Sequence, residues 1–300
     1  MSDSTVTGPG GRRAQVAVPR TVTGERGGGR HLLLRLRGSR RPPLWFEILL
    51  IAASYWTYSL IRNAVPEQKP EALRNADAVW WLEHQLGIAV EASVNHAADS
   101  VGWLIIGMNY YYATLHFVIT IGVLVWLYRW HPERYAPIRL VLFATTGVAL
   151  AGYYLFPLAP PRLMRGGHFV DTVMVHQTWG SMASGDLKHM SNQYAAMPSM
   201  HIGWSLWCGL TVFALASVPW VRVLGLVYPA LTLLVIVSTA NHFWLDAVGG
   251  VVCLGFGVGV ARLWYGRWPQ VPGPGAGSGA GSGAGSGAGS GAGTGAGQPA

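Results

Sequence analysis

The sequence predicts an all-α integral membrane protein, a six-helix bundle with an external cap of loop and helix and with disordered termini. Of its 300 residues, 51% are hydrophobic and 11% are charged, whereas ordinary soluble proteins carry about 25% charged residues. A soluble all-α protein would need far more charge to coat its surface. Six apolar runs have lengths near that needed to span a bilayer: residues 44–60, 101–127, 138–156, 198–218, 221–237 and 243–264.

Low-complexity ends flank a predicted membrane domain of residues 44–268. Residues 1–43 are rich in Gly, Arg, Ser and Thr with little apolar periodicity, which predicts a disordered basic arm. The arm is too long for the n-region of a secretory signal, so we expect the first span to be an uncleaved anchor. Residues 269–300 are almost entirely Gly, Ala and Ser from Pro272 onward. We expect a disordered tail there, with silk-like stacking as the alternative.

Charge position predicts the orientation. The arm before the first span contains nine Arg and no Lys against two acidic residues, which by the positive-inside rule places it in the cytoplasm. Six alternating spans then put both termini inside, together with Arg129, Arg134, Arg139 and Arg222, in what we expect to be the plasma membrane. The connection of residues 62–99 falls outside and carries three basic and six acidic residues. The basic balance therefore indicates topology and attraction to anionic lipids, and we expect no nucleic-acid partner.

Two external connections predict the cap. Residues 66–99 show an amphipathic helical pattern through Ala72, Ala76, Val79, Trp80, Glu83 and Leu86, typical of a helix on the membrane surface. The second connection is residues 158–197, which contains Trp179. Cys208 and Cys253 lie inside predicted spans, and we expect them to be buried thiols without a disulfide.

His242 and Asp246 stand four residues apart where an apolar run begins. In a helix, positions i and i+4 share a face, so Asp246 can accept a hydrogen bond from one ring nitrogen of His242 and leave the other facing outward. This is how a nucleophilic or basic imidazole is oriented. The alternative is a pair that only satisfies its own polar groups near the membrane interface.

Three further polar residues fall on the same predicted external face. Ser199 and His201 open the fourth span, and Arg162 follows the third, directly after a proline-rich exit. A planar, permanently charged donor suits a phosphate oxyanion, although an Arg can also snorkel to lipid headgroups. Together these five side chains supply a nucleophile, an orienting acid, an oxyanion binder and a leaving-group acid, the parts of a metal-free phosphoryl-transfer site.

The segments APPR at 159–162, PSMH at 198–201 and HFWLD at 242–246 resemble the three motifs of the type 2 phosphatidic acid phosphatase superfamily, most closely its inositol phosphorylceramide synthase-like branch. The resemblance covers about residues 45–265. It implies that His242 forms a phosphohistidine, that Asp246 orients it and that His201 protonates the leaving alkoxide. It further implies that Ser199 and Arg162 hold phosphate oxygens.

The sequence departs from the family pattern at two positions. The family has an Arg six residues before the nucleophilic His, where this chain has Ile236, and the first motif lacks the usual Lys before its Arg. Phosphate binding must then rely on Arg162, supported by Arg165 or Lys188. These departures fit the synthase-like branch better than a simple lipid phosphatase.

We therefore expect a membrane lipid phosphotransferase that works without metal or other cofactor on a lipid phosphate or phosphodiester, with an alcohol such as a polyol or lipid as acceptor. A lipid phosphate or pyrophosphate phosphatase of the same superfamily is the alternative. A non-enzymatic lipid or proton translocator remains open because His116 and Asn109 lie within the second span. A zinc site formed by His201, His242 and Asp246 also has enough ligands to be considered.

Overall fold

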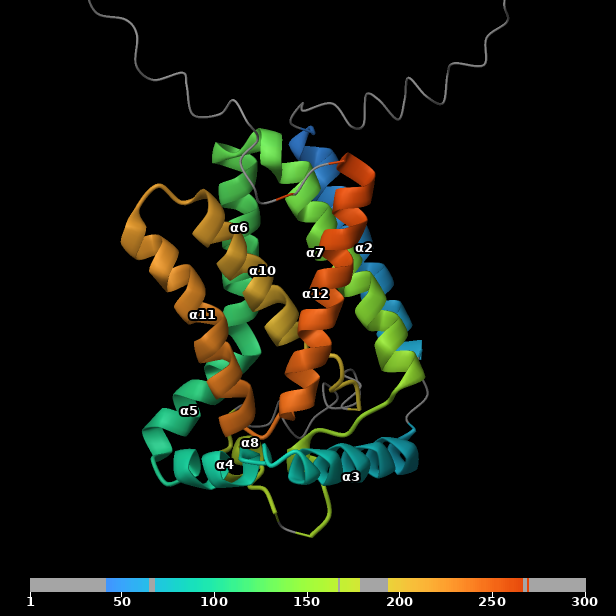
Figure 1. The fold of residues 1–300 in the computed structure, drawn as a ribbon, viewed down its shortest axis with the longest axis vertical. Helices are drawn as coiled ribbons and strands as arrows, with labels where there is room; N and C mark the ends of the chain where they lie inside the picture. Colours follow the sequence, from blue (N-terminus) through green and yellow to red (C-terminus); the bar gives the residue numbers. More distant parts are fainter. Residues whose placement is uncertain (1–41, 65–67, 167, 179–193, 267–268, 270–300) are drawn as a thin grey trace, which may run out of the picture. The chain divides into compact units, whose positions relative to one another are not determined.

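In this computed structural model, the described residues are 42–64, 68–166, 168–178, 194–266 and 269, and they form helices as predicted (Figure 1). Within them, strand pairing is limited to one isolated bridge between Leu158 and Ala195. The helices in chain order are α2 (Leu44–Ala64), α3 (Lys69–Gln85), α4 (Glu91–Asp99), α5 (Gly102–Tyr110), the π-helix η1 (Tyr111–Leu115), α6 (His116–Trp130), α7 (Pro132–Leu155), the 3₁₀ helix η2 (Pro161–Leu163), α8 (Thr172–Val175), α10 (Met200–Leu215), α11 (Pro219–Ser238) and α12 (Trp244–Tyr265). The predictions for the basic arm, apart from its last two residues, and for nearly all of the Gly/Ala/Ser tail fall outside this described part.

Among the described residues, four helical stretches are long and apolar enough to cross a membrane. They are the continuous stretch α5–η1–α6, which has 29 residues, and the helices α7, α11 and α12. Two more apolar helices, Leu44–Thr57 within α2 and Met200–Leu215, are shorter. The membrane prediction is confirmed for the four long stretches, and the count of six spans stays a prediction.

Large apolar side chains cover the outer faces of these helices. A soluble protein would bury such a surface, whereas lipid tails solvate it. Exposed examples on the spanning helices are Val118, Ile121, Val125, Leu155, Val223, Leu224, Val227, Val251, Val252 and Phe256.

Glycine allows the helices to approach one another closely. A Cβ atom added at Gly209 of α10 would lie 2.2 Å from the carbonyl oxygen of Gly225 in α11. One added at Gly257 of α12 would lie 2.3 Å from Thr145 Oγ1 in α7. Helices in membranes associate largely through such backbone contact, because lipid gives no hydrophobic drive for their side chains to meet.

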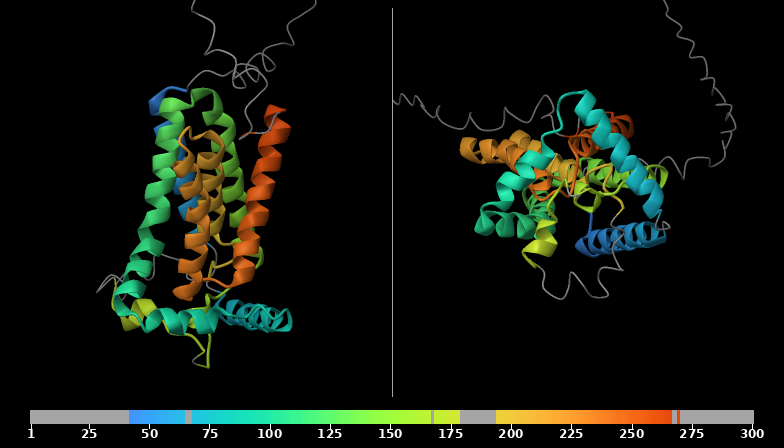
Figure 2. Two further views of the ribbon diagram at one scale, coloured as in Figure 1. Left: turned by 60° about the vertical axis from the view of Figure 1, so that its left-hand side comes forward. Right: turned by 90° about the horizontal axis from the view of Figure 1, so that it is seen from below.

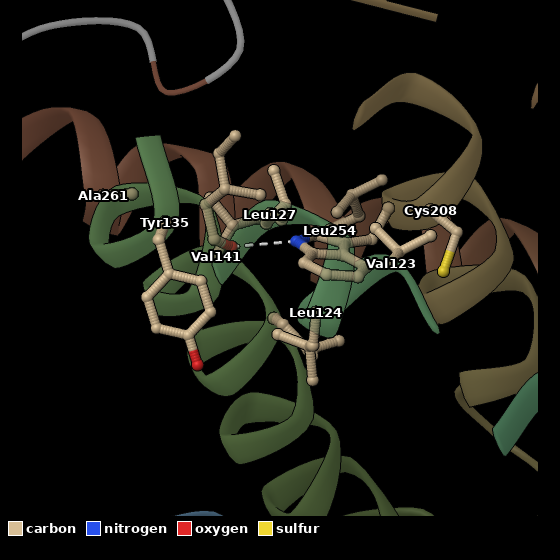
Figure 3. Packing of buried hydrophobic residues seen from close by; sticks show 11 residues of the cluster. Val123, Leu124, Leu127, Tyr135, Val141, Cys208, Leu254 and Ala261 are labelled. Carbon is tan, nitrogen blue, oxygen red and sulfur yellow. Dashed lines mark hydrogen bonds between the residues drawn. The ribbon is translucent and has the colours of Figure 1, made fainter. Parts of the chain in front are cut away.

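The main buried cluster joins α6, α7, α10 and α12 (Figure 3). Trp207 lies at its centre, where its Nε1 donates a hydrogen bond to the Ile138 carbonyl oxygen at 2.9 Å, which satisfies the polar atom of a fully buried indole. Cys208 belongs to this cluster, and both it and Cys253 are buried and free of disulfide. The prediction of buried thiols is confirmed.

Helices α3 and α4 lie across the end of the bundle at which α12 begins (Figures 1 and 2). Of the amphipathic pattern that predicted this helix, Ala72, Ala76, Val79 and Glu83 are buried in α3. Leu86, which follows the last residue of α3, is 57% exposed. Gly87, with φ of 70°, closes the helix, and the bonds from Gly87 N to His84 O and from Ile88 N to Glu83 O form the terminating motif that favours glycine.

Candidate active site

His242 and Asp246 meet as predicted, but not on one helical face. The helix α12 begins at Trp244, so His242 lies in the preceding turn and Asp246 in the first turn of the helix. His242 Nδ1 is 3.1 Å from Asp246 Oδ2, which also accepts the Phe243 backbone N–H at 3.0 Å. Because the carboxylate engages Nδ1, the ring directs Nε2 away from it. That Nε2 is buried and has no hydrogen-bond partner among the described residues.

The turn that holds His242 is formed by a strained backbone at the end of α11. Ala240 is fully buried and has φ of 49°, a left-handed conformation that non-glycine residues rarely adopt. The backbone N–H groups of Asn241 and His242 both donate to the Ile236 carbonyl oxygen, at 3.0 and 3.3 Å. Strain of this kind persists only where the surrounding contacts fix the chain, which is common at functional sites.

Arg162 of η2 is tied to this turn through both backbone and side chain. Its backbone N–H donates to the Ala240 carbonyl oxygen at 3.0 Å, and its Nε donates to Asn241 Oδ1 at 2.9 Å. Its Nη1 is 3.4 Å from Asp171 Oδ2. Asn241 in turn donates to Thr239 Oγ1 at 2.8 Å. The first motif is therefore held directly against the third, with the guanidinium oriented by an amide and a carboxylate.

Ser199 connects the second motif to the third. Its backbone N–H donates to the Asp246 carbonyl oxygen at 2.9 Å. Gly250 of α12 allows this approach, because a Cβ atom there would lie 2.4 Å from the Ser199 carbonyl oxygen. The Ser199 side chain is fully buried, and its Oγ has no hydrogen-bond partner among the described residues. A buried hydroxyl without a partner is costly unless a bound group satisfies it.

His201 faces His242 and the π-helix η1. The centroids of the two imidazole rings are 5.5 Å apart. The ring of Tyr112 stacks on His201 at 4.2 Å, and the Tyr112 carbonyl oxygen contacts His201 Nε2 at 3.2 Å and His116 Nδ1 at 3.0 Å. A π-helix shifts backbone carbonyl groups out of the regular α-helical pattern. Here the carbonyl oxygen of Tyr112 contacts two imidazoles.

Several contributors to the site were not predicted from the sequence. Asn241, Asp171 and Tyr112 contact predicted site residues directly, but none stands in a recognisable motif. The position of Asn241 next to His242 and the proximity of Tyr112 to His116 along the chain are the signals that could have suggested them. Asn109 was one of the two span residues that kept a translocator function open as an alternative. It accepts a hydrogen bond from Thr172 Oγ1 at 2.9 Å.

The remaining candidates differ in outcome. Arg165 is exposed, and no contact places it with Arg162 or the imidazoles. Lys188 lies outside the described residues. Ile236, where the family pattern has Arg, is fully buried and apolar, so that position supplies no cation. The described His, Cys, Asp and Glu side chains form no group of three or more that could hold a metal ion.

No curated protein and no solved structure matches the chain significantly. A family model described as the PAP2 superfamily matches residues 77–260, more than half of the chain. The matched region begins in α3 and ends in α12, and it contains all three motifs whose side chains meet at the end of the bundle. The chain belongs to the PAP2 superfamily.

Proposed function

We propose that the protein transfers a phosphoryl or phospho-head group of a membrane lipid through a phosphohistidine on His242. Membership of the PAP2 superfamily already indicates a lipid phosphatase-type or phosphotransferase-type function in a membrane. The observation that carries the finer proposal is the buried Nε2 of His242, which has no partner among the described residues while Asp246 holds Nδ1. A neutral imidazole held in this tautomer has its lone pair on Nε2, which is the atom that must attack phosphorus.

The surrounding groups fit the two steps of such a reaction. In the first step, Nε2 forms a bond to phosphorus, the bond from phosphorus to the leaving oxygen breaks, and His201 gives the leaving alkoxide its proton. In the second step, an acceptor oxygen attacks phosphorus, the bond to Nε2 breaks, and His201 takes the proton of the acceptor. Arg162 and the Ser199 hydroxyl neutralise charge on the phosphate oxygens, and Asp246 stabilises the imidazolium.

We infer that the acceptor is an alcohol, a polyol or a lipid hydroxyl, which makes the protein a transferase of the inositol phosphorylceramide synthase-like branch. Helices α3 and α4 cover the end of the bundle beside the site, and exclusion of water there favours a bound alcohol. The buried Ile236 supports the same branch, because simple phosphatases of the family pattern have an Arg at that position. Hydrolysis of a lipid phosphate or pyrophosphate is the alternative outcome.

The proposed orientation places the site on the external side of the plasma membrane. The junction of α6 and α7 lies at the end of the bundle opposite α3 and α4 (Figure 1), with Arg129 in the last turn of α6 and Arg134 in the first turn of α7. Arg222, at the start of α11, lies toward the same end as that junction. Basic residues near span ends favour the cytoplasm, so the end that carries His242 faces outward.

The experiment that tests the function uses purified protein in lipid vesicles with labelled lipid phosphate and lipid phosphodiester donors. We expect donor turnover, a new phosphodiester when a polyol or lipid alcohol is added, and no loss of rate on adding EDTA. His242→Ala should abolish turnover, whereas Asp77→Ala, on the exposed side of α3, should not. If inorganic phosphate is the product with every alcohol offered, the protein is a phosphatase. Loss of rate in EDTA with recovery on zinc would contradict the metal-free mechanism.

A further inference from the structure

The first turn of α12 is held by carboxylates from three different helices. The backbone N–H of Phe243 donates to Asp246 of α12 at 3.0 Å, that of Trp244 to Glu91 of α4 at 3.1 Å, and that of Leu245 to Glu83 of α3 at 2.9 Å. The first N–H groups of a helix have no partner within the helix, and their positive end favours negative charge. A single Ser or Asp at the N-cap usually suffices for this purpose. Here two residues from distant parts of the chain add to the local Asp246.

Glu83 and Glu91 form a buried acid pair. Both side chains are fully buried, and two adjacent carboxylates in such a place cannot both be ionised without a large cost. The pKa of Glu83 is raised to about 9, first by burial and then by the neighbouring Glu91 side chain and the charge of Asp246, while the hydrogen bond from Leu245 N–H opposes the rise. At neutral pH the Glu83 carboxyl therefore keeps its proton while its Oε1 accepts from Leu245 N–H.

Through its position, the pair connects helices α3 and α4 with Asp246 and His242, the residues of the proposed reaction. Asp246 lies in the turn that the pair holds, and it orients His242 through a bond of 3.1 Å. A shift of this turn moves the carboxylate relative to the imidazole. Displacements of about 1 Å at a reacting group can cost about 100-fold in rate. The pair thus acts on the nucleophile through backbone geometry and not by contact with the substrate.

We propose that Glu83 and Glu91 are positioning residues, which accept the backbone N–H groups of Leu245 and Trp244 and so fix the first turn of α12 and thereby the Asp246–His242 geometry. This inference rests on the proposed function, in which His242 is the nucleophile. It assigns a role in the reaction to α3 and α4, two helices that carry none of the three motifs.

The pair makes both stability and rate depend on pH. Because the pKa of Glu83 is raised from 4.5 to about 9, the folded protein keeps a proton that the unfolded chain releases. The contribution of Glu83 to the free energy of unfolding therefore falls as pH rises from about 4.5 to about 9. Above that range Glu83 becomes a buried anion beside the carboxyl groups of Glu91 and Asp246, so repulsion loosens the turn and kcat falls.

Two substitutions of Glu83 separate positioning from a merely structural role. In Glu83→Gln the uncharged amide oxygen still accepts from Leu245 N–H, so kcat at pH 7 should stay within about threefold of wild type. The fall of kcat above pH 9 should disappear in this variant. Glu83→Ala removes the acceptor, and kcat should fall by about 10- to 100-fold with KM changed by less than about threefold. Asp77→Ala on the same helix is the matched control, with no change expected.

A spectroscopic measurement decides the inference independently of turnover. In ¹⁵N-histidine-labelled protein in micelles, the proton on His242 Nδ1 should give a downfield resonance that is absent in His242→Ala. It should be unchanged in Glu83→Gln and shifted or broadened in Glu83→Ala. The positioning role would be overturned if Glu83→Ala left the resonance unchanged, or if Glu83→Ala left kcat at pH 7 unchanged. If no donor is turned over by the wild type, the proposed function fails, while the resonance still tests the geometry.

Discussion

Arg162 depends on Asn241 for its orientation. The guanidinium of Arg162 is mostly buried, and its Nε bond to Asn241 Oδ1 is 2.9 Å long. Asp171, which also contacts the guanidinium, is more distant at 3.4 Å. A planar cation recognises two phosphate oxygens only if its fork is aimed at them. In the proposed mechanism the aim of Arg162 matters more, because Ile236 stands where the family pattern has a second Arg.

Substitution Asn241→Ala should therefore weaken donor recognition. A hydrogen bond to a charged group contributes about 1.5–3 kcal/mol, so kcat/KM should fall by about 10- to 100-fold. The measurement is steady-state turnover of a labelled lipid donor in vesicles. In an Arg162→Ala background, Asn241→Ala should have little further effect, because Asn241 acts through Arg162. Additive losses in the double variant would show that Asn241 acts independently of Arg162.

Residue-level chemistry could be predicted from the sequence only where the partners are close along the chain. His242 and Asp246 are four residues apart, so any turn or helix start brings them together. Asn241 could not be connected with Arg162, because 79 residues separate them and an Asn next to a His has no specific meaning. For the same reason the contact between His201 and Tyr112, 89 residues apart, appears only in the folded chain.

At the scale of elements, hydropathy predicted the long apolar helices well. A lipid-facing helix needs apolar residues around most of its circumference, so composition along a window is enough to find it. Its local irregularities are not found in this way. The π-helix η1 lies inside an apolar stretch, where hydropathy does not distinguish it from a regular helix, yet it supplies the carbonyl of Tyr112 that contacts two imidazoles.

The start of α12 shows the same limit. The apolar run predicted a span from residue 243, and the helix begins at Trp244. However, the prediction placed His242 on the helix, whereas it belongs to the strained turn at Ala240. The amphipathic pattern of α3 included Glu83 but did not predict that it would be buried. The burial of Glu83 is explained by its neighbours in the folded chain, which are Glu91 and the backbone N–H of Leu245 in α12.

At the scale of the whole described domain, two backbone hydrogen bonds assemble the site. Arg162 N donates to Ala240 O and Ser199 N donates to Asp246 O. These backbone bonds alone connect the segments that carry the three motifs, and side-chain bonds add to them. The sequence predicted that all three lie on one side of the membrane, because they stand at alternate span ends. It could not predict that backbone groups would join them, since these are the same in every residue.

The orientation of the domain is tested by a matched pair of serines. Ser100 is exposed at the end of α4, and Ser217 is exposed in the loop between α10 and α11. The 16 residues of α10 separate that loop from Ser199 by about 24 Å. In a background of Cys208→Ala and Cys253→Ala, Ser100→Cys should react with a membrane-impermeant thiol reagent added to intact cells. Ser217→Cys should react only after permeabilisation, and the reverse result would place the site in the cytoplasm.

The central claim is that His242 carries the phosphoryl group between donor and acceptor. The most direct measurement is to mix purified protein with a labelled lipid donor, quench in alkali, digest, and map the labelled peptide by mass spectrometry. The account predicts one label on His242 that survives base and is lost in acid, as a phosphoramidate is. It also predicts that His242→Ala abolishes both label and turnover. Full turnover by His242→Ala, or a label on another residue, would contradict it.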